Sequence, residues 1–499
     1  MELKFETRPC RYLRSMLREI QNLEQTQELR LTDGMPDIGR VLCAWGQVLL
    51  RGKEWRGDGM SASGGVMVWV LYAPENGSAP QCVDAWLPFQ GKWSFQMTDR
   101  EGIIRMMPLL RSVDARTVSA RKIMIRAGIG IMGEALVPFD TQISVPGELP
   151  EGVQVLRNTY PMHLPREAGE KTFLLDEEYT LTTSGQMAEE IIRYELCPQL
   201  ADCKVMAGKL VFRGTGQAHI LYRNQNGEFI SRDLEIPFSQ FTELDEDFGQ
   251  DADAAIDMAV TSLEVDLTDE GSLRLKCGLV AQYVVSDRVL LELGEDAYSL
   301  RRDVTPHFQE LCLPAILDQR REVAAAELSL DDGCSRIVDV CFMPDHPRMT
   351  RIGETVTGEL SSLWQILYED TNGMIQSVTR RWEQNMGVDV SDDAALLLTV
   401  GIDGVPVISA SGEGATVKEN VILNIRAEAE RGQIMIDSLD VGEEKKPDPN
   451  RPSLILRRTE GERLWDIAKA CGTTVQSICQ ANGLTDEPES GRMLLIPVI

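Results

Sequence analysis

Two short motifs have the spacing of enzyme sites, and both lie in one stretch of alternating residues. The stretch Gly128–Gly133 (GIGIMG) has the glycine spacing of a dinucleotide-binding loop, which must follow a strand and open a helix to hold a pyrophosphate. The stretch Ser119–Lys122 (SARK) has the Ser-x-x-Lys spacing of acyl-serine enzymes, which requires companion motifs that are missing here. The flanking residues alternate as in a strand and give no helix signal. We therefore expect neither site, and no enzymatic activity.

Residues that could bind metals are present but scattered. The chain has 11 cysteines and four histidines, without a Cys-x-x-Cys pair or a second ligand at zinc spacing beside any histidine. The acidic stretch 243–257 lacks the glycine and the closing glutamate of a calcium loop. We expect reduced, mostly buried thiols, structural histidines, a solvated acidic linker, and neither metal nor other cofactor.

Charge and length restrict the class of protein further. Fifty Lys and Arg against 78 Asp and Glu give a formal charge of −28, which repels nucleic acid and anionic lipid but leaves a basic protein partner open. The first 29 residues lack the apolar core of a signal peptide, and no stretch approaches the roughly 18 apolar residues of a membrane span. We expect a soluble cytoplasmic protein. A chain of 499 residues predicts three or four domains.

A repeat organises most of the chain. A Leu-Tyr pair followed after three residues by Asn-Gly occurs three times, starting at Leu71, Leu221 and Leu367, with steps of 150 and 146 residues. Apolar residues ending in Asn-Gly are typical of a strand that turns into a hairpin. Turns precede each copy near residues 34, 185 and 333, and paired alternating strands follow, with reversals near residues 119, 269–271 and 411–414. Domain-sized steps indicate one β-rich unit used three times.

The two ends of the chain differ from the repeats. Tyr12, Met16, Ile20 and Leu23 have helical spacing, which predicts an N-terminal helical segment over residues 1–24 that packs on the first unit or docks to a partner. Residues 442–452 are charged and proline-rich, so we expect an extended linker. The last 47 residues read as strand, helix, helix, strand.

This tail closely resembles a LysM module. The resemblance is carried by Gly461, by the run 464–468 (LWDIA), by 481–484 (ANGL) and by 491–497. It implies a shallow groove between two loops, which many members use to bind N-acetylglucosamine polymers. Carried onto this sequence, the groove residues are Glu460, Gly461, Glu462, Arg463, Asn482, Gly483, Leu484 and Thr485. The usual Pro-Gly-Asp-Thr of the family is EGER here, with a long cation in place of the hydroxyl, so we favour a protein partner over glycan.

The repeats resemble the SPOCS domain (DUF3794), formerly a domain of unknown function. The residues that carry the resemblance are 35–42, 70–72, 87–89, 113–116 and 121–123, with weaker counterparts in the second and third units. Three such domains followed by one LysM is the layout of SipL-like spore coat morphogenetic proteins. The fold class that follows is mainly β: three tandem antiparallel β-sandwich or barrel-like SPOCS domains, then a small βααβ LysM domain. The predicted boundaries are 25–150, 165–298, 305–441 (divergent), 442–452 (linker) and 453–499.

The resemblance also implies a function. It suggests a non-enzymatic scaffold of sporulation, made in the mother cell and recruited to the forespore surface or spore coat. The LysM module would tether the coat-basement ATPase, a SpoIVA-like protein, and the β-domains would bind other coat proteins. The alternative is a peptidoglycan-binding protein that acts at the cortex or cell wall.

Overall fold

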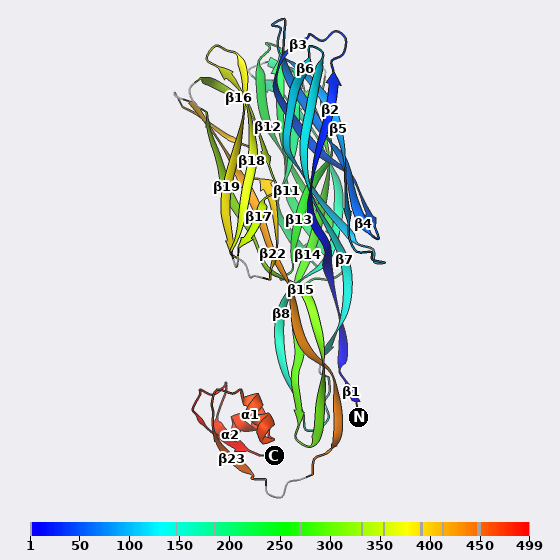
Figure 1. Cartoon of the computed structure of the whole chain (residues 1–499), viewed down its shortest axis with the longest axis vertical. Coiled ribbons are helices and arrows are strands. Elements are labelled where there is room, and N and C mark those ends of the chain that lie inside the picture. Colours follow the sequence, from blue (N-terminus) through cyan, green and yellow to red (C-terminus); the bar gives the residue numbers. More distant parts are fainter. Residues whose placement is uncertain are drawn as a thin grey trace.

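The computed structural model describes residues 2–145, 147–183, 186–268, 272–330, 333–352, 355–389, 393–411, 414–446 and 451–498. In this part of the chain nearly all regular structure is β-strand, and two short helices lie near the C-terminus (Figure 1). The predicted fold class, mainly β with a small βααβ domain, is therefore confirmed. The predicted turns at 184–185, 269–271, 331–332 and 412–413 and the linker residues 447–450 lie outside the described residues.

Each repeat is built from two facing antiparallel sheets. In unit one the first sheet has the order β2-β7-β6 and the second the order β3-β4-β5. The strands are β2 (Glu6–Arg30), β3 (Ile38–Arg56), β4 (Gly59–Pro74), β5 (Gln81–Ser94), β6 (Ile103–Ser119) and β7 (Lys122–Val145).

Units two and three repeat this order of strands. In unit two, β13-β14-β8 faces β12-β11-β10, with the short β9 beside β10. Its strands are β8 (Val153–Thr180), β9 (Thr182–Thr183), β10 (Gln186–Met206), β11 (Lys209–Asn224), β12 (Phe229–Glu243), β13 (Asp253–Leu267) and β14 (Ser272–Ser299).

Unit three divides two strand positions, each between two short strands: β16 and β17 along one edge of β18, and β20 and β21 along one edge of β22. Its β15 and β22 pair along their length, and β20 and β21 both pair with the other edge of β22. The strands are β15 (Arg302–Leu330), β16 (Cys334–Pro344), β17 (Arg348–Ile352), β18 (Thr355–Asp370), β19 (Ile375–Asp389), β20 (Ala395–Ile402), β21 (Val407–Ser411) and β22 (Gly414–Glu444). The first residues of the chain, β1 (Glu2–Lys4), also pair with β22.

The three predicted hairpins are present. The Leu-Tyr pairs lie near the ends of the central strands β4, β11 and β18, and each strand turns into its neighbour through the Asn-Gly that follows. The turn glycines Gly77, Gly227 and Gly373 have φ of 75°, 84° and 74°, a region that L-residues rarely adopt. The Leu-Tyr/Asn-Gly signature therefore marks the centre of each unit's second sheet.

The predicted N-terminal helix is wrong, because β2 occupies residues 6–30 and pairs with β7 from Glu6 to Arg30. A bulge at Met16 interrupts the register between Ser15 and Leu17 and reverses which residues face inward. Before the bulge the even-numbered residues Cys10 and Tyr12 face the core. From Gln21 onward the odd-numbered residues, several of them glutamine, are the less exposed ones. Because the inward-facing positions change from even to odd numbers at the bulge, the apolar residues of this strand have a spacing like that of a helix.

The units also begin earlier than predicted. Their opening strands start at residues 6, 153 and 302, instead of 25, 165 and 305. The third unit ends at residue 444, so β22 takes up the first residues of the predicted linker. Each opening strand pairs with the closing strand of its own unit, and both must therefore belong to the same fold.

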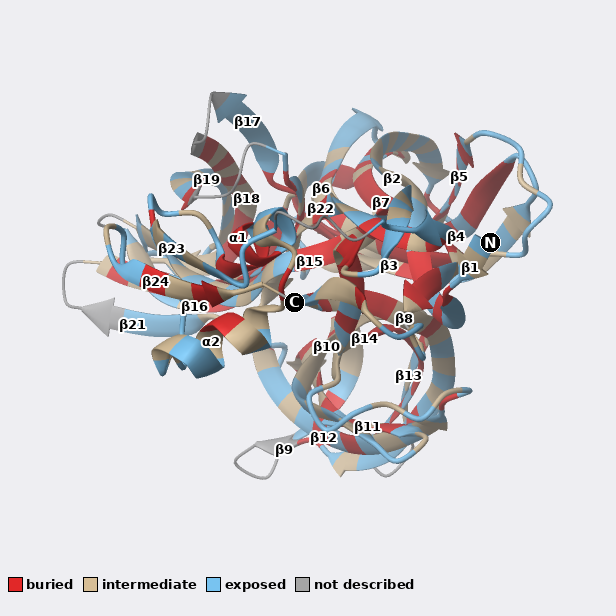
Figure 2. Ribbon diagram, turned by 90° about the horizontal axis from the view of Figure 1, so that it is seen from below, coloured by how far each residue is buried: buried red, intermediate tan, exposed pale blue. Residues whose placement is uncertain are grey.

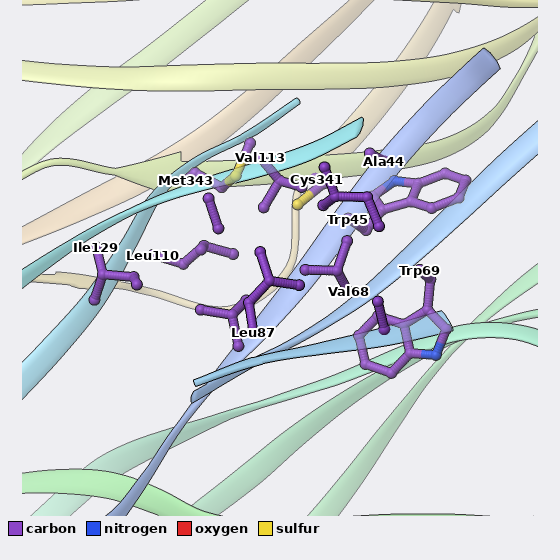
Figure 3. Packing of buried hydrophobic residues seen from close by; sticks show 14 of the residues in the cluster. Ala44, Trp45, Val68, Trp69, Leu87, Leu110, Val113, Ile129, Cys341 and Met343 are labelled. Atoms are coloured by element: carbon purple, nitrogen blue, oxygen red, sulfur yellow. The ribbon is translucent and has the colours of Figure 1, made fainter. Parts of the chain in front are cut away.

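The three units share one core instead of folding as separate domains. Seen from below, their sheets surround a common axis (Figure 2). The largest hydrophobic cluster contains all three repeated leucines, Leu71, Leu221 and Leu367. In Figure 3, Cys341 and Met343 of unit three lie beside Trp45 and Leu110 of unit one. Burial of these side chains makes the body a single packed structure.

A buried ionic network lies where the units meet. The residues paired with the three repeated leucines are Cys43, Arg193 and Asp339, one from each unit. The Arg193 Nε lies 2.8 Å from Asp339 Oδ2, and both side chains are at most 1% exposed. His219 bridges Asp339 and Asp233, with 2.6 Å from a ring nitrogen to a carboxylate oxygen on each side. Three equivalent positions thus hold three different chemical groups.

The pKa of His219 follows from these contacts. Burial and the Arg193 cation lower it, but the hydrogen bonds to Asp233 and Asp339 outweigh both and raise the pKa of His219 to about 9. Burial raises the pKa of Asp339, yet Arg193 and His219 hold it far below its usual range. The structural role predicted for the histidines fits this residue.

A narrow stalk extends below the body (Figure 1). It consists of three two-stranded ribbons, β2/β7, β8/β14 and β15/β22, packed around side chains such as Tyr12, Leu164 and Leu313. Each opening strand has a bulge at an equivalent place, at Met16, Arg166 and Leu317. Bulges increase strand twist, so we attribute the change from open sheets to a tight stalk to this repeated irregularity.

The C-terminal module folds as predicted, with β23 (Leu454–Arg458), α1 (Leu464–Cys471), α2 (Val475–Asn482) and β24 (Met493–Pro497). Gly472 and Gly483 end the helices with φ of 67° and 62°, as C-terminal glycines do. The Thr474 hydroxyl accepts from the Ser477 N–H and caps α2. Ile478 of α2, with Leu464 and Ile467 of α1, fills the core against β24.

Candidate binding groove of the C-terminal module

The predicted groove lies between two loops that the fold holds together tightly. The first loop is Thr459–Arg463 and the second is Gly483–Arg492. Thr459, which is 2% exposed, binds the second loop at three places: its N–H donates to Arg492 O at 2.9 Å, its hydroxyl donates to Glu489 O at 2.8 Å, and its carbonyl accepts from the Gly491 N–H at 2.7 Å. The base of the groove is therefore rigid.

A carboxylate from the second loop caps the helix that follows the first loop. Arg463 occupies the N-cap of α1 and makes no side-chain capping bond. The Leu464 N–H instead donates to Glu487 Oε2 at 2.8 Å, which satisfies one of the free donors at the helix start. The sequence interpretation did not include Thr459 or Glu487, because neither residue carries the family signature.

The four predicted residues of the first loop have different roles. The Glu462 carboxylate accepts from the Glu460 N–H at 2.7 Å and from Arg457, and these hydrogen bonds lower its pKa. Gly461 has φ of 98° and serves the turn. Arg463 is exposed and pairs with Asp466, with Nε 3.1 Å from Oδ2. The side chains of Glu460 and Arg463 are the ones presented to solvent.

The second loop likewise combines structural and exposed residues. The Asn482 amide donates to Ile478 O and Leu495 O at 2.8 and 2.6 Å, and its Oδ1 accepts from the Leu495 N–H at 2.7 Å. Leu484 is half-buried against the module's core. Thr485 is exposed, and its hydroxyl donates to Asp486 at 3.0 Å. Asn482 and Leu484 therefore hold the loop in place, and Thr485 remains available to a ligand.

The module also docks on the stalk, through residues that the sequence did not indicate. Asp296 near the end of β14 accepts from the Trp465 indole N–H at 2.8 Å, and both its oxygens lie 2.8 Å from Lys469 Nζ. The Tyr298 hydroxyl donates to Thr473 O at 2.7 Å, and the Tyr298 and Trp465 rings meet edge to face at 4.8 Å. Figure 1 shows α1 facing the stalk.

The docking contact shifts the pKa values of the two stalk residues that form it. Burial raises the pKa of Asp296, but the hydrogen bonds from Lys469 and Trp465 prevail, so its pKa lies below the usual value. Burial, and secondarily Asp296, raises the pKa of Tyr298 to about 12. On the linker side, Lys445 donates to the carbonyl of Ser299 at 2.8 Å. The module is held against the stalk instead of moving freely on the linker that the sequence predicted.

The remaining chemical motifs lie in structural positions. The GIGIMG stretch lies within β7, and Ser119 and Lys122 end and begin neighbouring strands. All 11 cysteines are free: four are buried, six half-buried and one exposed. No group of three metal-ligating residues occurs among the described residues. Asp257 of the acidic stretch pairs with the buried Arg105, so this end of the stretch is not the solvated linker expected.

The chain is thus a three-unit β-sandwich body with a docked βααβ module. Residues 187–268, within unit two, match the family model described as the SipL, SPOCS domain, and residues 459–497 match the LysM domain. These matches are the two families that the sequence resembles, although the SPOCS match falls on unit two and the strongest likeness was expected in unit one. The chain matches no curated protein and no solved structure.

The two matched domains support a sporulation-related protein with a module of a peptidoglycan-binding class. No helix in the described ranges is long and apolar enough to cross a membrane.

Proposed function

We propose that this chain is a non-enzymatic scaffold of spore coat assembly. In this proposal the LysM module binds the SpoIVA-like ATPase of the coat basement, and the three-unit body binds further coat proteins. The protein acts in the mother-cell cytoplasm and is recruited to the forespore surface. The combination of a SPOCS domain with a LysM domain in one chain supports the sporulation role.

The observation that carries the scaffold proposal is the docking of the module on a rigid stalk. Because Asp296 and Tyr298 bind the module directly, a partner in the groove would be held at a fixed place relative to the body. The energetic cost of binding a second component falls when the first is already positioned. The outer strands β5, β12 and β19 each end a sheet, and such edges accept added strands from partners.

The groove itself favours a protein ligand over a sugar polymer. Its exposed side chains are Glu460, Arg463 and Thr485. Arg463 of the first loop forms an exposed ion pair with Asp466, and such charged groups can pair with the charged groups of a protein partner. The alternative, binding of peptidoglycan at the cortex or wall, is favoured by the LysM match itself.

Pull-down experiments with the full chain distinguish these functions. The bait is the wild type or the double variant Glu460→Lys/Arg463→Glu, and Lys418→Glu on the exposed face of β22 is the matched control. The prey are purified SpoIVA-type ATPase and insoluble peptidoglycan. Retention of the ATPase by the wild type and the control, lost in the double variant, is the expected result.

Two outcomes would contradict the scaffold proposal. Retention of peptidoglycan alone, lost in the double variant, would assign the module to the cortex or wall. A measurable turnover of glycan or ester substrates by the purified chain, abolished by a single substitution, would make the protein an enzyme.

A further inference from the structure

A cavity of about 590 Å³ lies at the junction of the three units. Unit one contributes residues of β6, unit two residues of β10 and β13, and unit three residues of β15, β20 and β22. Unit three also contributes His346, between β16 and β17, whose ring nitrogens make no hydrogen bond in the described structure and whose pKa is lowered by burial. Its volume is in the range of small-molecule sites, which occur preferentially between domains. Neither the SPOCS match nor the LysM match assigns a ligand to this place.

The wall of the cavity contains a buried guanidinium whose hydrogen bonds are incomplete. The Arg426 side chain is 9% exposed, and its Nε lies 2.6 Å from Glu428 Oε1. The Nε nevertheless makes no hydrogen bond in the described structure, so its N–H does not point at that oxygen. A guanidinium has five donors, and a buried donor without an acceptor is costly.

The nearest carboxylate is shared between two cations. Glu428 Oε1 lies beside Arg426 Nε, and Glu428 Oε2 accepts from Arg18 at 2.8 Å. Glu134 binds both Arg18 and Arg105, and Arg105 takes Asp257 as its second partner. Burial lowers the pKa of Arg426; Glu428 and Glu134 oppose this effect, and Arg105 and Arg18 add to it, but an arginine remains charged in a protein. Arg426 therefore has only a shared counter-ion, and its remaining donors can take an oxyanion from outside the chain.

The rest of the lining mixes apolar and charged residues. Leu200 and Ile256 come from unit two and Leu397 and Ile402 from unit three. The other charged groups of the lining pair within the chain: Arg105 with Asp257, Arg320 with Asp318 and Glu322, Arg321 with Asp403, and Asp202 with Arg213. Arg426 is therefore the lining cation left to take the single anionic group of a ligand, whose apolar part can lie on the apolar residues. We propose that this junction cavity binds a small organic carboxylate, with its carboxylate on the Arg426 guanidinium and its apolar part against units two and three.

The proposal is tested with the full chain and sodium octanoate as the probe, by titration calorimetry and by thermal unfolding. Octan-1-ol, which lacks the charge, and inorganic phosphate, which lacks the apolar part, are the comparison ligands. The expected result is saturable binding of one octanoate per chain, with a higher melting temperature, and at least tenfold weaker binding of both comparison ligands.

Three variants locate the site. Arg426→Gln removes the cation and is expected to weaken octanoate binding at least tenfold. Gly401→Leu fills the cavity without touching a charge, because a Cβ at Gly401 would meet only Ile422, at 3.9 Å. It should abolish binding even if Arg426→Gln fails to fold. Lys418→Gln lies on the same strand, is 54% exposed and should bind as the wild type does.

The proposal fails if the wild type does not bind octanoate, if octan-1-ol binds equally well, or if Gly401→Leu folds and retains wild-type affinity. Equal binding of inorganic phosphate would also overturn it, because the apolar walls would then have no part in recognition. These results do not depend on whether the LysM module binds protein or glycan.

Discussion

Release of the LysM module from the stalk is the prediction that the structure defines most sharply. The substitution Asp296→Ala removes the acceptor of the Trp465 indole N–H and the counter-ion of Lys469, both at 2.8 Å. It leaves the module's own core unchanged, because Asp296 belongs to the stalk.

The free energy that Asp296 contributes to docking can be estimated from the solvent exposure of Asp296 and Lys469. Asp296 is 23% exposed and Lys469 44% exposed, so the ion pair contributes at most about 1 kcal/mol after solvent screening. The hydrogen bond from the indole to an ionised carboxylate contributes about 1.5–3 kcal/mol. A total of about 2–3 kcal/mol corresponds to roughly a 30- to 160-fold larger population of released module.

Limited trypsin proteolysis measures this population. The Lys445 side chain is bound to Ser299 O and its N–H to Arg301 O, so cleavage after Lys445 requires local opening. When opening is fast, the rate of cleavage follows the open population. We expect Asp296→Ala to be cut roughly 30- to 160-fold faster than the wild type by the same estimate.

The matched control is Asp486→Ala, which removes a carboxylate of the module that binds Thr485 and makes no contact with Asp296 or Tyr298 among the described hydrogen bonds. It should be cut at the wild-type rate. If Asp296→Ala is also cut at that rate, while circular dichroism shows both variants folded, the docking contact does not hold the module and the argument is refuted.

The remaining predictions concern stability. The pKa of His219 is raised from 6.5 to about 9, so the protonated ring contributes roughly 3 kcal/mol to the free energy of unfolding. This contribution is complete below pH 6.5 and is lost as the pH rises through 9. Denaturant unfolding should show this pH dependence for the wild type and not for His219→Gln. Asp339→Ala leaves the buried Arg193 with only the more exposed Glu195 as a carboxylate partner and should cost about 3–5 kcal/mol by the same measurement. Gly227→Ala places a Cβ at φ of 84° and should lower stability by about 1–2 kcal/mol, whereas a neutral result would contradict the turn assignment. Arg463→Thr supplies an N-cap hydroxyl to α1 and should stabilise the LysM module by about 1 kcal/mol, seen as slower hydrogen exchange in α1.

The parts of the fold that the sequence predicted depend on local signals. The hairpins could be predicted because Asn-Gly permits the positive φ found at Gly77 and Gly373. The C-terminal module could be predicted because Gly472 and Gly483 end two short amphipathic helices. These signals act within a few residues, so no tertiary contact is needed to interpret them.

The parts that the sequence missed depend on distant contacts. The bulge at Met16 becomes visible only when β2 is paired with β7, and without it the spacing of the apolar residues imitates a helix. The contact between Asp296 and Trp465 joins residues 169 positions apart, and no local pattern marks either as an interface residue. Thr459 and Glu487 support the predicted groove from positions that the family signature does not include.

The sequence revealed only part of the structural equivalence of the three units. Cys43, Arg193 and Asp339 occupy the same place in each second sheet, but their side chains have nothing in common chemically. Three identical charged residues at this buried junction would repel one another, whereas Arg193 and Asp339 attract. Divergence at this equivalent position therefore permits an ion pair between units.

Both ends of the ordered chain lie at the foot of the stalk, and this arrangement determines how the molecule would respond to tension. The N-terminal strand β1 is joined to β22 by three residue pairs, from Glu2↔Asp440 to Lys4↔Ser438. A pull between the N-terminus and the LysM module would peel this short pairing and the docking contact apart, and would load the broad body last. Under tension we therefore expect the short β1/β22 pairing and the docking contact to open before the three-unit body unfolds.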